Sequence, residues 1–217
     1  YKLLEPWVQW VTIHTGKEFK DHKVFRLGDI INHKNLSQIF ESLENKGLTI
    51  GAVSPFNAEN RLKNPAFFIP DPWTKTKVKG NFLVKAIYKA VHQSVNDNAQ
   101  SKLNFASIFS LGLGILVYVP IMRWFHYIKL VLNSKKPGIK AIILDSLLSD
   151  VFISLIKKYN PDFSNLFLNS GAHIQHHYLF NSQAYRGTLK NPSWYCKKNY
   201  DPLILILKEY DHVIGEL

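Results

Sequence analysis

A cluster of histidines lies in the segment LNSGAHIQHHYLF, residues 168–180. His173 and His177 are four residues apart, and Asn169 lies four residues before His173. If the segment is helical, these three side chains share one face, and two imidazoles at this spacing suit one metal ion. No Cys, Asp or Glu is adjacent, so the ligand set is incomplete. Spacing alone therefore leaves open whether these histidines, with the neighbouring His176, bind a metal or are ordinary core and surface residues.

Charge and composition narrow the class of ligand. The 217 residues include 27 Lys and Arg against 16 Asp and Glu, and 46% of the chain is hydrophobic. A chain of this length and composition can bury a sizeable core, which excludes a disordered protein. The excess of cations favours an anionic partner: phosphate, nucleic acid, acidic polymer or membrane surface. Cys196 is the single cysteine, so an internal disulfide is excluded and the redox compartment stays open.

Apolar patterns predict the elements that would position the histidines. A helix over 35–47 is followed by the apolar strand 48–53, which together form one unit of a layered α/β fold with buried parallel strands. The passage 54–73 is rich in Pro and Asn and is predicted to be an irregular loop. A second strand, 163–168, ends directly before the histidines. Because ligands gather at the carboxyl ends of parallel strands, this position favours a site.

The sequence between the two predicted strands has a helical pattern. Apolar residues recur at three- and four-residue steps through 82–95 and through 142–156. We therefore divide the chain into three parts: an N-terminal part of a catalytic α/β domain (1–77), a helical cap or insertion (78–158), and a continuation of the catalytic domain with the metal-site loop (159–217).

One uncharged stretch could contact a membrane. Residues 105–122, FASIFSLGLGILVYVPIM, contain no charge over 18 residues. This length is at the lower edge of the roughly 17–25 residues that cross a bilayer. Two glycines, one proline and two serines weaken the case for a span, so we expect a buried or surface-inserting helix.

Neither end of the chain carries a recognisable signal. The chain begins with Tyr1 and lacks the basic and apolar stretches of a signal peptide. Its last residues, EYDHVIGEL, belong to a predicted amphipathic helix that is not followed by a Gly or Pro stop signal. We therefore expect a fragment that is incomplete at both ends, and the compartment is unknown.

The segment YNPDFSNLFLNSGAHIQHHY, residues 159–178, resembles the middle metal-binding segment of the type I phosphodiesterase and nucleotide pyrophosphatase group of the alkaline phosphatase superfamily. In that group a Pro-Asp-Phe turn leads into a strand, and an Asp and a His four residues later bind one of two catalytic zinc ions. His173 stands at this histidine and Asn169 at the aspartate. A neutral amide supplies no charge, so this departure affects metal affinity or preference, and His177 is placed to supply a further ligand.

A second stretch, EPWVQWVTIHTGKEFKDHKVF, resembles the nucleophile segment of the same group. There a Thr or Ser precedes a Thr-Gly pair by nine residues, and a His follows the pair. Thr15, Gly16 and His22 match the end of this pattern. Pro6 lies nine residues before Thr15, where the nucleophile would be, and proline has no nucleophilic group.

Other residues of this stretch are therefore our candidates for chemistry. With the nucleophile position occupied by proline, the resemblance implies catalytic roles for Glu5 and Thr12, and contacts to substrate oxygens for Gln9 and His14. An ordinary role for Thr12 on the face of a helix or strand, and for Thr15 in a turn, is the alternative.

The resemblance covers 5–71 loosely and 159–217 more closely. It implies an alkaline-phosphatase-like layered fold with a mostly parallel sheet and a helical cap insertion. It also implies a metal-dependent hydrolase of phosphate or sulfate esters, first of all a phosphodiesterase, with two divalent ions, expected to be zinc, in the complete protein. The substrate would be an anionic small-molecule or polymer ester, and no specific nucleic acid is expected. The alternative is a catalytically degenerate relative that binds an anionic glycan, lipid or nucleic acid, which Pro6 and Asn169 favour.

Overall fold

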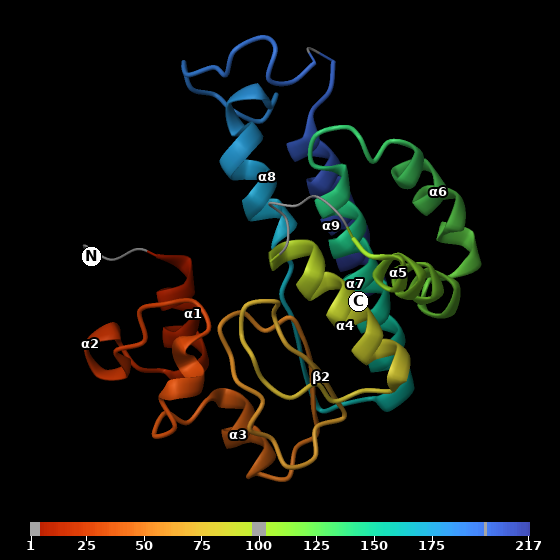
Figure 1. The fold of residues 1–217 in the computed structure, drawn as a ribbon. Coiled ribbons are helices and arrows are strands. Elements are labelled where there is room, and N and C mark those ends of the chain that lie inside the picture. Colours follow the sequence, from red (N-terminus) through yellow and green to blue (C-terminus); the bar gives the residue numbers. More distant parts are fainter. Residues whose placement is uncertain (1–4, 97–102, 198) are drawn as a thin grey trace. The chain divides into compact units, whose positions relative to one another are not determined.

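A parallel three-stranded sheet in the order β2–β1–β3 is built from β1 (Ile50–Val53), β2 (Phe67–Ile69) and β3 (Phe163–Leu166). The computed structural model describes residues 5–96, 103–197 and 199–217 (Figure 1). In the register, Gly51 pairs with Phe67 on one side and with Ser164 on the other. Every residue of β1 is buried, as expected for the central strand of a parallel sheet. The predicted mixed α/β class with a parallel sheet is confirmed.

The bounds of the strands differ in part from the sequence prediction. β1 and β3 fall inside the predicted strands 48–53 and 163–168. β2 lies inside the passage 54–73, which was predicted to be irregular. This strand has only three residues between Pro65 and Pro70, so the turn-forming composition around it hides the strand pattern. Pairing with β1, which is distant in sequence, fixes it.

The chain forms two compact units, which we describe separately. Unit 1 comprises Tyr1–Val117 and Ser154–Phe167, and unit 2 comprises Tyr118–Ile153 and Leu168–Leu217. The helices of the predicted cap 78–158 are shared between the two units.

The sheet belongs to unit 1, together with a series of helices. These are α1 (Pro6–Thr15), α2 (Phe19–His22), η1 (Asp29–Asn32), α3 (Ile39–Glu44), α4 (Phe82–Asn96) and most of α5 (Phe105–Tyr118). α3 is shorter than the predicted helix 35–47 because Gln38 caps it: the Gln38 backbone N–H donates to the Glu41 carboxylate at 2.9 Å. Leu36 precedes the helix and is buried against Val11 of α1.

Unit 2 is helical within the described residues. It contains η3 (Ile121–Arg123), α6 (Trp124–Leu132), the first part of α7 (Ile139–Tyr159), α8 (Ser170–Tyr178), η4 (Leu179–Asn181) and α9 (Pro202–Glu216). α8 packs beside α9 (Figure 1), and Ile174 of α8 shares an apolar core with Ile206 of α9 and Ile142 of α7. The start of α8 is fixed by buried Asp145, whose carboxylate accepts from the Ser170 backbone N–H at 2.8 Å.

The uncharged stretch 105–122 forms α5 and the beginning of η3. Phe105, Ile108 and Phe109 of α5 are exposed, so this face of the helix lies on the surface of its unit. Among the helices that the structure describes, none combines the length and apolarity that crossing a membrane requires.

Candidate functional site

Helix α1 packs against the carboxyl edge of the sheet. Just after β1, Asn57 donates from Nδ2 to the carbonyl oxygen of Trp7 at 3.0 Å, and Phe56 accepts at 3.1 Å from Nε2 of His14. Just after β3, the ring of Phe167 meets Trp10 edge-on, with the ring centroids 5.1 Å apart. The predicted catalytic segment therefore lies at the sheet edge where ligands of α/β proteins gather.

The turn after β1 is held in an unusual conformation. Ser54 and Asn57 have φ angles of 55° and 52°, in the left-handed region that residues other than glycine rarely adopt. Asn57 is fixed there by hydrogen bonds. Its Oδ1 accepts from the Gly28 backbone N–H at 2.9 Å, its Nδ2 donates to the carbonyl oxygens of Trp7 and Arg26, and its own N–H donates to the Asp71 carboxylate at 2.9 Å. Backbone strain of this kind persists where the surroundings hold it and is concentrated at functional sites.

The carboxylate of Asp71 stabilises the neighbouring loop. It accepts hydrogen bonds from the backbone N–H groups of Trp73 and Thr74, at 2.8 and 2.9 Å, and from the Thr74 hydroxyl at 2.7 Å. Burial raises the pKa of Asp71, and these hydrogen bonds oppose the increase. The carboxylate of Asp71 therefore has a structural role: its hydrogen bonds fix the loop at 73–74 and the turn at Asn57.

The first turn of α1 contains two of the candidate residues and the unexpected proline. Glu5 is the N-cap residue, and its carbonyl accepts from the Val8 and Gln9 N–H groups, while its side chain makes no capping hydrogen bond. Gln9 is exposed. Pro6 is the first helical residue, where a proline fits because this N–H has no partner within the helix. The residue that replaces the expected nucleophile thus has a structural reason to be there.

The hydroxyl of Thr12 is paired with His22. Thr12 Oγ1 lies 3.2 Å from Nε2 of His22, whose Nδ1 accepts from the Val24 backbone N–H at 3.0 Å. Burial is the main cause that lowers the pKa of His22, so the ring is neutral near pH 7. Since Nδ1 is an acceptor, the ring proton is on Nε2 and is donated to Thr12. In this form His22 does not act as the base for a Thr12 nucleophile.

His14 is an interior residue. Its side chain is 3% exposed, and Nε2 donates to the Phe56 carbonyl oxygen. Burial lowers the pKa of His14 to about 4, although the hydrogen bond to Phe56 opposes this change. The neutral ring joins α1 to the turn after β1, and contact with a substrate would require the ring to leave Phe56.

In unit 2, the histidine cluster is helical, which is the condition under which its spacing places His173 and His177 on one face. The first residue before α8 is Asn169, whose carbonyl accepts from the His173 N–H at 3.0 Å. The rings of His173 and His177 are edge-on, with centroids 4.8 Å apart, while buried Ile174 faces the core. Partial burial, and then His177 and His176, lower the pKa of His173, which keeps its ring neutral and able to bind a metal near pH 7.

These residues do not form a complete metal centre. Throughout the part of the chain that the structure describes, no three side chains of His, Cys, Asp or Glu are grouped so that they could hold a metal ion. Zinc sites use three or four protein ligands, and Nδ1 of His177 also lies 3.4 Å from the Tyr195 hydroxyl. The pair His173 and His177, with Asn169, fits one weakly held ion at most and does not fit a two-zinc centre.

The sequence did not reveal an open pocket of about 830 Å³ in unit 1. The lining comes from four places in the chain: Lys34, which lies two residues after η1, the segments 59–61 and 75–77, and one face of α4. The lining residues are Lys34, Glu59, Asn60, Arg61, Lys75, Thr76, Lys77, Tyr88, Lys89 and His92. The signal in the sequence was the alternation of Lys and Thr in TKTK, residues 74–77, together with Lys89.

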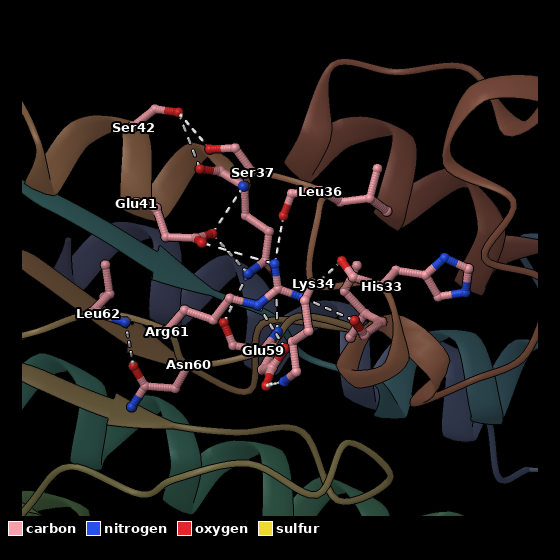
Figure 2. A network of polar contacts seen from close by, with 12 residues as sticks. His33, Lys34, Leu36, Ser37, Glu41, Ser42, Glu59, Asn60, Arg61 and Leu62 are labelled. Carbon is pink, nitrogen blue, oxygen red and sulfur yellow. Dashed lines mark hydrogen bonds and ion pairs between the residues drawn. The ribbon is translucent and has the colours of Figure 1, made fainter.

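One wall of this pocket is a polar network centred on Arg61 (Figure 2). Its guanidinium donates to Glu59 at 2.6 Å and to the carbonyl oxygens of Leu36 and Ile30, at 2.5 and 3.0 Å. Glu59 also pairs with Lys34. Glu59 is the one acidic residue of the lining, and its charge is thus already matched.

The remaining cations of the pocket have no such partner. Lys75, Lys77 and Lys89 are exposed and form no ion pair with any residue that the structure describes. Beside them, the Thr76 hydroxyl accepts from the Asn60 N–H at 3.0 Å, which leaves its own proton free to be donated. Unmatched ammonium groups around a hollow of this size are suited to an anionic ligand.

Comparison with known proteins gives no match: no family model, no curated protein and no solved structure is similar to this chain.

Proposed function

We propose that this chain binds anionic esters and belongs to a metal-dependent hydrolase. The first substrate class is phosphate esters, above all phosphodiesters, and the second is sulfate esters. The observation that carries the proposal is the pocket of unit 1, in which Lys75, Lys77 and Lys89 have no acidic partner among the residues that the structure describes. An anionic ester would supply the missing negative charge, and the positive net charge of the chain would attract it.

Three other side chains of the pocket suit the rest of such a ligand. The Thr76 proton is available to an ester oxygen. Tyr88 and His92 present aromatic rings from α4, with centroids 6.0 Å apart. An aryl or other planar leaving group could pack against them. The anion and its organic part would therefore be recognised by different sides of the same pocket.

The proposal that the protein hydrolyses esters draws on the resemblance of two segments to the alkaline phosphatase superfamily. With it we propose that the complete protein has the layered fold of that superfamily. The packing of α1 on the carboxyl edge of the sheet supports it. A divalent ion, when bound, would polarise the ester. Because the described donor groups do not complete a metal centre, we derive no step through the ion.

A second function, binding without hydrolysis, is favoured by one specific observation. His22 donates to Thr12 instead of accepting its proton, and Pro6 has the helix-starting role of a proline. A degenerate relative would keep the lysine pocket and bind an anionic glycan, lipid or nucleic acid.

The test is hydrolysis of bis(p-nitrophenyl) phosphate, with p-nitrophenyl phosphate and p-nitrophenyl sulfate for comparison, by protein produced from its complete natural reading frame. We expect turnover that depends on zinc and is abolished by EDTA. His173→Ala should lower the turnover rate by roughly tenfold or more, whereas the neighbouring His176→Ala should leave it near the wild-type rate. Turnover that survives EDTA and His173→Ala would contradict the metal-dependent mechanism. Tight binding of pyrophosphate with no turnover of any ester would establish the second function instead.

A further inference from the structure

Helix α6 exposes its apolar face. In an ordinary surface helix the apolar stripe faces the core and the polar side faces water. In η3 and α6 the stripe formed at three- and four-residue steps by Met122, Phe125, Ile128 and Leu132 faces solvent instead. Met122 is 88%, Phe125 77% and Leu132 80% exposed. A contiguous apolar surface of this kind marks an interaction site.

The other face of the helix is fixed in place, so the stripe is not free to rotate inward. Tyr127 is buried and donates to the Asp150 carboxylate at 2.6 Å. Arg123, at the start of the helix, donates to the same carboxylate at 2.7 Å and pairs with Glu209. Leu130 packs into the apolar core of unit 2. These buried contacts, all within unit 2, hold the apolar stripe outward.

Positive charge accompanies the stripe and acidic residues are absent around it in the sequence. The chain has no Asp or Glu from residue 98 to residue 144. Lys129 lies within α6, and Lys135, Lys136 and Lys140 follow it closely, all of them at least partly exposed. A second copy of this chain would bring the same lysines face to face with no acidic group from this stretch to match them. An anionic lipid surface matches both the apolar stripe and the lysines.

We propose that η3 and α6 bind the surface of an anionic lipid bilayer. Phe125, Met122 and Leu132 enter the boundary between headgroups and acyl chains, and the lysine ammonium groups lie at the level of the lipid phosphates. The nine residues of α6 are too few to cross the bilayer, so the helix lies in the plane of the interface. From the sequence we expected a buried or surface-inserting helix at 105–122, and this proposal concerns the neighbouring residues 121–132 with the lysines that follow. This inference does not depend on the proposed enzymatic function.

The experiment is flotation of the protein with vesicles of phosphatidylcholine alone and of phosphatidylcholine mixed with phosphatidylserine. We expect binding to the mixed vesicles that weakens as salt is added. Met122→Ser with Phe125→Ser lowers the partition coefficient by roughly tenfold or more, and Lys129→Gln with Lys135→Gln lowers it on mixed vesicles only. Ile214→Ser, which removes an exposed apolar side chain of α9 in the same unit, is the matched control and leaves binding unchanged.

Circular dichroism and sedimentation of the lipid-free protein accompany the flotation. Folded variants with unchanged vesicle binding would overturn the proposal. Equal binding to both vesicle types, or to neither, would do so too. A dimer that Phe125→Ser dissociates would show that a second copy covers this face.

Discussion

The Thr12 hydroxyl oxygen accepts a hydrogen bond from Nε2 of His22, at 3.2 Å, because Nδ1 of that ring already accepts from the Val24 N–H. The neutral ring then has one proton to give, and Thr12 receives it. This pair links α1 to the end of α2.

Thr12→Val is therefore expected to destabilise the fold more than it changes ligand binding. It leaves Nε2–H of His22 without its acceptor, which costs about 1–2 kcal/mol in free energy of unfolding. Denaturant titration measures this loss, and Thr12→Ser, which keeps a hydroxyl, is the control. Loss of turnover with Thr12→Val at unchanged stability would instead identify Thr12 as a nucleophile.

The buried ring of His14 predicts that unit 1 is sensitive to acid. Its pKa is about 4 in the folded chain, against the ordinary histidine value of 6.5 in an unfolded chain. The unfolded state therefore binds more protons between these values, so stability is lost as the pH falls from about 6.5 to about 4. His14→Gln keeps a donor for the Phe56 carbonyl without titrating, and should remove about 3 kcal/mol of this pH dependence. The same substitution at the exposed His212 is the control.

Asp145 in unit 2 changes the stability with pH in the direction opposite to His14. Burial raises its pKa to about 6, although hydrogen bonds from Tyr210 and Ser170 oppose the increase. The folded state holds this proton more tightly than the unfolded state does, so the contribution is present below about pH 4 and is lost as the pH rises through 6. Asp145→Asn should remove about 3 kcal/mol of this effect, measured as the difference from wild type in unfolding experiments between pH 4 and 7. An unchanged pH profile in Asp145→Asn would show that the carboxyl is already ionised throughout.

The face of α8 predicts which histidines bind zinc. His173 and His177 are four residues apart, with their ring centroids 4.8 Å apart, and His176 takes no part in this ring contact. In zinc titrations followed by calorimetry, His173→Ala and His177→Ala should each weaken binding by roughly tenfold, and His176→Ala should not. Equal effects of all three substitutions would indicate surface histidines that bind zinc without a defined site.

The sequence was informative where the pattern is local. The apolar runs at 48–53 and 163–168 predicted β1 and β3, and the shared face of His173 and His177 was expected on condition that their segment is helical, which it is. β2 was missed because its three residues are defined by long-range pairing with β1. The exposure of the apolar stripe on α6 was also not predictable, since it depends on buried partners of Arg123 and Tyr127 from α7 and α9.

The lysine pocket shows the same limit for the site. Lys75 and Lys77 lie in the segment after β2, and Lys89 lies in the middle of α4. Short runs of lysine are usually solvated surface, and nothing in the spacing brings these three residues together. These three lysines differ from ordinary surface lysines because Glu59, the one acidic residue of the pocket lining, is already paired with Arg61 and Lys34.

Binding of pyrophosphate to this pocket is the measurement that tests the central claim most directly. In calorimetric titrations at low salt, replacing Lys75, Lys77 and Lys89 together by alanine should raise the Kd by roughly tenfold or more. The matched control replaces three exposed lysines of unit 1 that do not line the pocket, Lys46, Lys63 and Lys157, and so removes the same net charge. A large loss with the pocket variant and a Kd within about twofold of wild type for the control is the predicted result. Equal losses in both variants, or no binding by the wild type, would contradict an anion site in this pocket.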